Sequence, residues 1–68
     1  MEIKWVDGFK ISVRSDDEVV ISANREGLLS LARQLAALAE KEDGAHIHYD
    51  EYNSLETNSK ELIIEKIK

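Results

Sequence analysis

The order of apolar patterns along the chain predicts an α+β domain in which one helix packs on a mainly antiparallel sheet. Two short stretches with strand-like alternation come first, a stretch with helical periodicity follows, and two further strand-like stretches close the chain. The chain has 68 residues, which leaves room for a single core because domains usually contain about 100 to 150 residues. We therefore expect one two-layer domain over residues 1–68, with the order ββαββ.

The first two strands are expected near residues 9–13 and 19–23. The first stretch alternates apolar and polar residues, and the second is rich in β-branched residues. Residues 15–18 between them are turn formers, and so short a connection makes the two strands antiparallel. Residues 1–6 alternate more weakly, and the Asp-Gly pair at 7–8 favours a tight turn, so one extra short N-terminal strand is an option.

The helix is expected between Asn24 and Gly44. Asn24 is a good N-cap residue, and Gly44 is typical of a helix end. Gly27 in the first turn costs about 1 kcal/mol relative to alanine, which indicates either a close backbone approach or no structural need. The apolar stripe predicted to cover the sheet consists of Leu28, Leu31, Ala32, Leu35, Leu38 and Ala39. The face predicted to point outward consists of Arg25, Arg33, Gln34, Ala37, Glu40 and Lys41.

Two strands are expected after the helix. Residues 46–50 alternate so that His46 and His48 share one face, and a polar loop follows over residues 51–59. The last strand, from Glu61 to Ile67, has apolar residues on both faces. A strand of this kind is central in a sheet or lies against a partner, so this segment is a candidate homodimer interface.

The charge balance narrows the classes of partner. The chain has 14 acidic and 9 basic residues and a net charge of −5. Nucleic-acid binding relies on clustered lysine and arginine, so we expect no nucleic-acid partner. Residues 40–68 carry eight acids and four bases, whereas residues 1–39 carry six and five. Such a surface attracts a basic partner, although surplus acids also serve solubility alone.

The absence of certain residue types and segments sets further limits. The sequence has no cysteine, which excludes disulfides and zinc held by thiolates. It has no apolar run of signal-peptide or membrane-span length, so we expect a cytoplasmic protein that does not enter a membrane. The serines lack the context of a nucleophile, and no glycine-rich phosphate loop is present. We therefore expect neither an enzyme nor a cofactor.

His46 and His48 are the weak candidates for metal ligands. Their spacing puts the imidazoles about 6 to 7 Å apart along one strand face, and zinc sites of the carbonic-anhydrase type use such a pair with a third ligand. Asp50 lies too far along the strand to complete the site, and Glu56 and Glu61 have no defined geometry. A metal site, a catalytic pair and a polar face that contacts a partner are all open interpretations. The polar face is favoured, with no metal.

Three segments resemble a known family. They are Asn24 to Leu28 (NREGL), Gly44 to Leu55 (GAHIHYDEYNSL) and Ser59 to Ile67 (SKELIIEKI). Together they resemble immunity protein family 32, small bacterial proteins predicted to neutralise the toxin domains of polymorphic toxin systems, over roughly residues 20 to 67.

The resemblance implies a binding module whose partner is a toxin. The motif positions carried over as partner-binding residues are His46, His48, Asp50, Glu51 and Tyr52. A basic toxin fits the acidic charge of the chain, so stoichiometric inhibition by protein contact is the favoured interpretation. The alternatives are a self-associating structural domain and a metal-binding protein that uses the two histidines.

Overall fold

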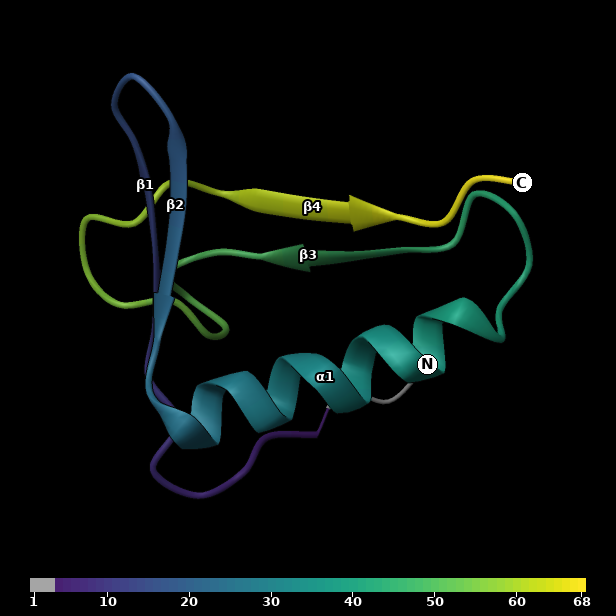
Figure 1. The fold of residues 1–68 in the computed structure, drawn as a ribbon, viewed down its shortest axis with the longest axis horizontal. Helices are drawn as coiled ribbons and strands as arrows, with labels where there is room; N and C mark the ends of the chain where they lie inside the picture. The colour runs from purple at the N-terminus through teal and green to yellow at the C-terminus, as the bar shows by residue number, and fades with distance from the viewer. Residues whose placement is uncertain (1–3) are drawn as a thin grey trace.

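The computed structural model describes residues 4–68 and has one helix and four strands (Figure 1). The elements follow in the order β1 (Ile11–Ser15), β2 (Val19–Ala23), α1 (Arg25–Ala39), β3 (His46–Tyr49) and β4 (Leu62–Glu65). The predicted α+β class and ββαββ order are confirmed. Residues 4–10 form a turn at Asp7 and Gly8 but no strand. The remainder of the optional N-terminal strand, residues 1–3, lies outside the described residues.

The four strands form two separate antiparallel sheets, β1–β2 and β3–β4, where one continuous sheet was expected. The reason lies at the second edge of β1, where Glu56 N donates to Ile11 O at 2.8 Å and Lys60 N donates to Val13 O at 2.9 Å. The loop before β4 thus takes the hydrogen bonds that another strand would use. The β1–β2 hairpin consequently runs across the direction of β3 and β4 (Figure 1).

The core lies where the two hairpins, the helix and the loop before β4 meet. Its buried apolar residues are Ile11, Val13, Leu38, Ile47, Tyr49 and Leu55. The N-terminal segment closes one side of this core, because Trp5 stacks on Phe9 with a centroid distance of 4.3 Å and meets Tyr49 edge-on at 6.0 Å. No helix within residues 4–68 is both long and apolar enough to span a membrane.

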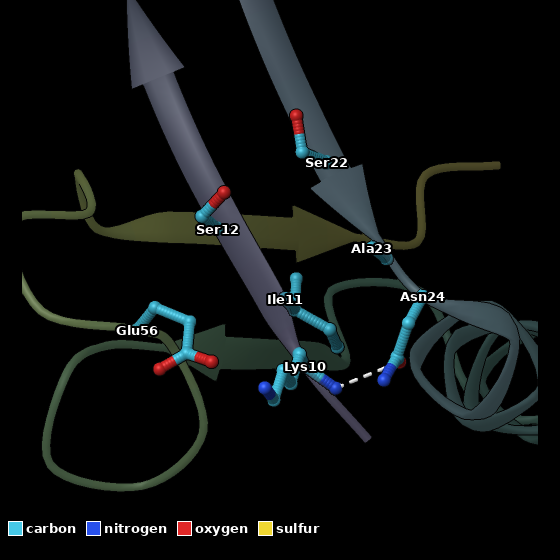
Figure 2. Close-up of a pocket in the computed structure, with 7 residues that line it drawn as sticks. All are labelled: Lys10, Ile11, Ser12, Ser22, Ala23, Asn24 and Glu56. Carbon is cyan, nitrogen blue, oxygen red and sulfur yellow. Dashed lines mark hydrogen bonds between the residues drawn. The ribbon is translucent and has the colours of Figure 1, made fainter. Parts of the chain in front are cut away.

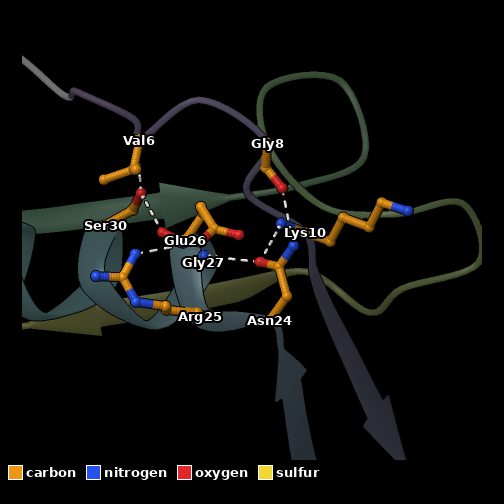
Figure 3. Close-up of polar contacts among 8 residues, drawn as sticks. All are labelled: Val6, Gly8, Lys10, Asn24, Arg25, Glu26, Gly27 and Ser30. Atoms are coloured by element: carbon orange, nitrogen blue, oxygen red, sulfur yellow. Dashed lines mark hydrogen bonds and ion pairs between the residues drawn. The ribbon is translucent and has the colours of Figure 1, made fainter.

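Asn24 joins the start of α1 to the N-terminal segment. Its Oδ1 accepts hydrogen bonds from Gly27 N and Lys10 N, both at 2.8 Å, and its Nδ2 donates to Gly8 O at 2.8 Å (Figure 3). The predicted N-cap is therefore confirmed. The helix ends at Ala39, before Gly44, and Gly44 uses a φ of +90° in the turn that leads to β3.

The helix packs so closely at Gly27 that no side chain fits there. A Cβ at this position would lie 2.5 Å from Lys10 O, 2.9 Å from Ile11 Cγ1 and 3.1 Å from Ala23 Cβ. Two of these contacts are shorter than real Cβ atoms make. The close backbone approach, one of the two interpretations of Gly27, is therefore confirmed.

The buried face of α1 is rotated away from the predicted stripe. The buried helix residues are Gly27, Ser30, Gln34 and Leu38, while Leu31 is half-buried against the core. The prediction that the whole stripe covers a sheet was wrong for Leu28, Ala32, Leu35 and Ala39, which are exposed. The prediction that Gln34 points outward was also wrong.

The rotation has a polar cause. Ser30 Oγ accepts from Val6 N and donates to Glu26 O, both at 2.8 Å (Figure 3). Gln34 Nε2 donates to Lys4 O at 2.8 Å, and its Oε1 accepts from the hydroxyl of Tyr49 at 2.7 Å. A buried backbone needs hydrogen-bond partners that leucine cannot supply. The N-terminal segment therefore lies along the polar side of the helix. Because that side is buried, Leu28 and Leu35 are left exposed to solvent.

Candidate functional site

The β3–β4 sheet has one buried face and one open face. In its antiparallel register His46 is paired with Glu65 and His48 with Ile63. Paired residues point to the same side of a sheet, and neighbours along a strand alternate. The intervening pairs, Ile47 with Ile64 and Tyr49 with Leu62, face the core. We call the side formed by His46, His48, Ile63 and Glu65 the outer face.

The outer face combines apolar and ionisable groups. Ile63 is 59% exposed, and Ile67, which follows β4, is 75% exposed. His48 Nε2 lies 3.4 Å from Glu61 Oε2, and both side chains are largely exposed. An exposed pair of this kind contributes at most about 1 kcal/mol to stability. The folded state therefore depends little on these groups, which are available for contact with another molecule.

The loop after β3 is organised by two acidic side chains. Asp50 Oδ1 accepts from Tyr52 N at 3.0 Å and from Asn53 N at 2.9 Å, while Glu51 Oε2 accepts from Asn58 N at 2.7 Å. These bonds satisfy backbone groups of the turn, as aspartate commonly does. The backbone of the loop is therefore fixed, and the side chain of Tyr52 projects from it into solvent, 97% exposed.

The five sequence-predicted site residues thus divide into two groups. His46 and His48 lie together on the outer face, and Tyr52 projects from the adjacent loop. Asp50 and Glu51 are engaged in holding that loop. The residues that sequence reasoning did not assign to the site are Ile63 and Glu65, opposite the histidines. The sequence shows that Ile63 and Glu65 lie on the same face of their strand. Only the register of the sheet shows that this face is also the face of the histidines.

The two histidines are not part of a three-ligand group among the described residues. Within residues 4–68, no three side chains of histidine, cysteine, aspartate or glutamate are grouped so that they could hold a metal. Tyr49, which follows His48 and faces the core, is 1% exposed, and burial raises its pKa above the ordinary value of 10.0. The strand therefore alternates open imidazoles with buried, neutral groups.

A shallow pocket of about 390 Å³ lies on the other hairpin, next to the helix start (Figure 2). Its lining consists of Lys10, Ile11, Ser12, Ser22, Ala23, Asn24 and Glu56. The lining contains two serines and no histidine, whereas a serine nucleophile needs an adjacent base. Asn24 is already engaged in the helix cap. The pocket does not contain the histidine and serine pair of a hydrolase.

Comparison with known proteins identifies the family. The family model described as immunity protein 32 matches residues 18–67, which is most of the chain. The chain belongs to the immunity protein 32 family. The match begins just before β2, so it includes the helix, the outer face and the Tyr52 loop of this immunity protein and leaves out β1. Membership implies a toxin-neutralising role and a protein partner in general terms. Neither a curated protein nor a solved structure matches the chain.

Proposed function

We propose that this immunity protein neutralises a cognate toxin domain by stoichiometric, non-enzymatic binding, and that the outer face together with Tyr52 forms the contact surface. The observation that carries the proposal is the exposure of Ile63, Ile67 and Tyr52 within the part of the chain that matches the family. Large apolar and aromatic side chains left in solvent on a small domain are typical of a protein-binding surface.

The composition of the outer face fits a protein partner. Interfaces place apolar and aromatic anchors at the centre and polar groups around them. Here Ile63 and Tyr52 supply anchors, and His46, His48 and Glu65 supply polar groups that exchange hydrogen bonds with a partner. The hydrogen bonds of Asp50 hold the backbone of Tyr52 in place before binding, which reduces the backbone entropy lost on association. Asp50 and Glu51 thus support the contact by shaping the loop.

Charge favours a basic toxin. Residues 40–68 have eight acids and four bases, and this segment includes the outer face and the loop. Complementary charge accelerates association and adds specificity, and salt screens it. We expect the association rate with a basic toxin to fall as salt is raised. An association rate that does not change with salt would contradict the electrostatic part of the proposal.

The test uses the toxin domain captured from lysate of the source bacterium with the full chain as bait, then purified and titrated by calorimetry. We expect one copy of the chain to bind each toxin domain. Ile63→Ser and Tyr52→Ala should each raise Kd by about tenfold or more, which corresponds to roughly 1.4 kcal/mol. Val19→Ser is the matched control, because Val19 is also a β-branched, 66% exposed strand residue but lies on β2.

Toxicity on co-expression provides the functional readout. The unchanged chain and Val19→Ser should restore growth of cells that express the toxin domain, and Ile63→Ser should restore it less. If the Ile63 and Tyr52 variants bind and protect as well as the unchanged chain does, the outer face is not the contact surface. If the chain turns over the toxin at substoichiometric amounts, the mechanism is enzymatic and the proposal is wrong.

Self-association through the segment from Glu61 to Ile67 is the competing proposal for the same surface. Its support is the exposure of Ile63 and Ile67. Because a second copy on this surface would exclude the toxin, a dimer of this kind would compete with toxin binding. An apparent Kd for the toxin that increases with the concentration of the immunity protein would favour this competing proposal.

A further inference from the structure

The helix leaves an apolar face uncovered. Leu28 is 57% exposed and Leu35 is 40% exposed, and Ala32 and Ala39 are exposed as well. We call these four residues the Leu–Ala stripe. No polar requirement explains two leucines in water, since arginine or glutamine would keep the helix equally well. An apolar face of this kind is typical of a surface that another chain covers.

The spacing of the Leu–Ala stripe is that of a helix pair. Its four residues are separated by steps of 4, 3 and 4 positions, the pattern that lines up residues along a coiled-coil seam. Over these positions the side chains alternate between large and small. With a rise of about 1.5 Å per residue, the stripe extends for roughly 16 Å along α1.

The alternation makes the stripe complementary to itself in one orientation. If a second copy of α1 lies antiparallel, with the twofold axis between positions 33 and 34, Leu28 meets Ala39 of the second copy and Ala32 meets Leu35 of the second copy. Each large side chain then fills the space beside a small one, as close packing requires. In a parallel pair leucine would meet leucine and alanine would meet alanine, which leaves gaps beside the alanines.

Charge supports the same orientation. The antiparallel arrangement brings Arg25, at the start of the helix, to the end of the second copy's helix, where Glu40, Glu42 and Asp43 follow Ala39, and the twofold axis repeats this contact. The side chain of Arg25 is 79% exposed, and its Nη1 lies 3.4 Å from Glu26 Oε2 in a weak surface contact. Glu42 is exposed beyond the end of the helix. Antiparallel helix dipoles also attract one another.

We propose that a second copy of this chain packs on the Leu–Ala stripe, with α1 against α1 in antiparallel orientation, to form a twofold-symmetric dimer. The stripe shares no residue with the outer face, so this inference does not rest on the proposed function. A contact built on one helix is smaller than the roughly 800 Å² per partner of a standard interface. We therefore expect a Kd on the order of micromolar and a dimer that forms as concentration rises.

Sedimentation velocity of the full chain over a range of concentrations tests the dimer. We expect a monomer–dimer equilibrium in which Leu35→Glu raises the dimer Kd by about tenfold or more, because it buries an unpaired charge. Ile63→Glu is the matched control on the outer face and should leave the equilibrium unchanged. A chain that is monomeric at every concentration overturns the proposal. Loss of the dimer in Ile63→Glu alone also overturns it and assigns self-association to the segment from Glu61 to Ile67.

Charge reversal tests the orientation, and cysteine pairing tests the register. Arg25→Glu should weaken the dimer, because it places an acid opposite the acidic residues that follow the helix of the second copy. The chain has no cysteine, so a mixture of Leu28→Cys and Ala39→Cys variants should oxidise mainly to the mixed disulfide. Disulfides of each variant with itself would indicate parallel helices and overturn the antiparallel arrangement. Circular dichroism confirms that each variant is folded, which is expected because all the changed positions are exposed.

Discussion

The two hairpins are attached to the rest of the molecule in different ways. The β1–β2 hairpin is held through side chains and backbone together, because Ile11 and Val13 are buried in the core and their carbonyl oxygens accept from the loop before β4. The β3–β4 hairpin is held through side chains on one face, such as the Tyr49 hydroxyl that donates to Gln34. The β3–β4 hairpin therefore depends on its buried face, and all four side chains of its outer face are exposed. Its outer face can therefore change without changing the fold.

The strongest test of this contrast compares neighbouring positions on β3. Tyr49→Ala removes a fully buried ring and should destabilise the protein by about 3–5 kcal/mol. His48→Ala, one position earlier and on the outer face, should change stability by no more than about 1 kcal/mol. Urea denaturation followed by circular dichroism measures both. Comparable losses for the two variants would show that the outer face also supports the fold.

The next effect concerns the close approach of α1 to the first hairpin. Gly27→Ala should destabilise the protein by about 1–3 kcal/mol, because the added methyl would meet the backbone oxygen of Lys10 at 2.5 Å. Helix propensity alone predicts the opposite sign, since alanine is about 1 kcal/mol better than glycine in a helix. A thermal melt distinguishes the two outcomes. A rise in Tm would mean that the helix and hairpin can separate without cost.

A smaller effect is expected at the helix cap. Asn24→Ala removes all three side-chain hydrogen bonds of Asn24 and should cost about 1–2 kcal/mol. Asn24→Asp keeps the acceptor for Gly27 N and Lys10 N but loses the donor to Gly8 O. It should therefore lose less than half of the free energy that Asn24→Ala loses. Equal losses in the two denaturation curves would assign the main contribution to the bond with Gly8.

The smallest effect is a dependence on alkaline pH. Burial raises the pKa of Tyr49, so the neutral phenol is favoured in the folded state. The stability that this group contributes is complete below the unfolded pKa of about 10 and decreases as pH rises through the higher folded pKa. Tyr49→Phe should cost about 1 kcal/mol at neutral pH by leaving Gln34 Oε1 without its donor. Its stability should then decrease less than that of the unchanged chain between pH 9 and 11, as alkaline denaturation would measure.

Local patterns were enough to predict the elements. The alternation around Ile11 and Val13, the turn formers that follow and the N-cap at Asn24 each depend on residues close in sequence. The structure confirms the element order and the cap. Residues 46–49 likewise alternate as expected, with the histidines exposed and Ile47 and Tyr49 buried. For the candidate site, this local alternation was sufficient to place both histidines on one face.

Local patterns were not enough to predict how the helix is oriented. The leucine periodicity favoured burial of Leu28 and Leu35, but the N-terminal segment required polar partners and received them from Ser30 and Gln34. The roles of Asp50 and Glu51 were hidden for a similar reason, because a carboxylate in a loop has the same sequence signature whether it binds a partner or its own backbone.

The sequence by itself determined the class of the fold, the position of each element and the acidic charge, because these depend on spacing and composition. Only the tertiary structure decided that the strands divide into two sheets, that Ile63 and Glu65 stand opposite the histidines, and that two leucines of α1 are left at the surface. The physical reason is that register and burial result from competition for hydrogen bonds between segments far apart in the chain, such as residues 4–6 and the helix.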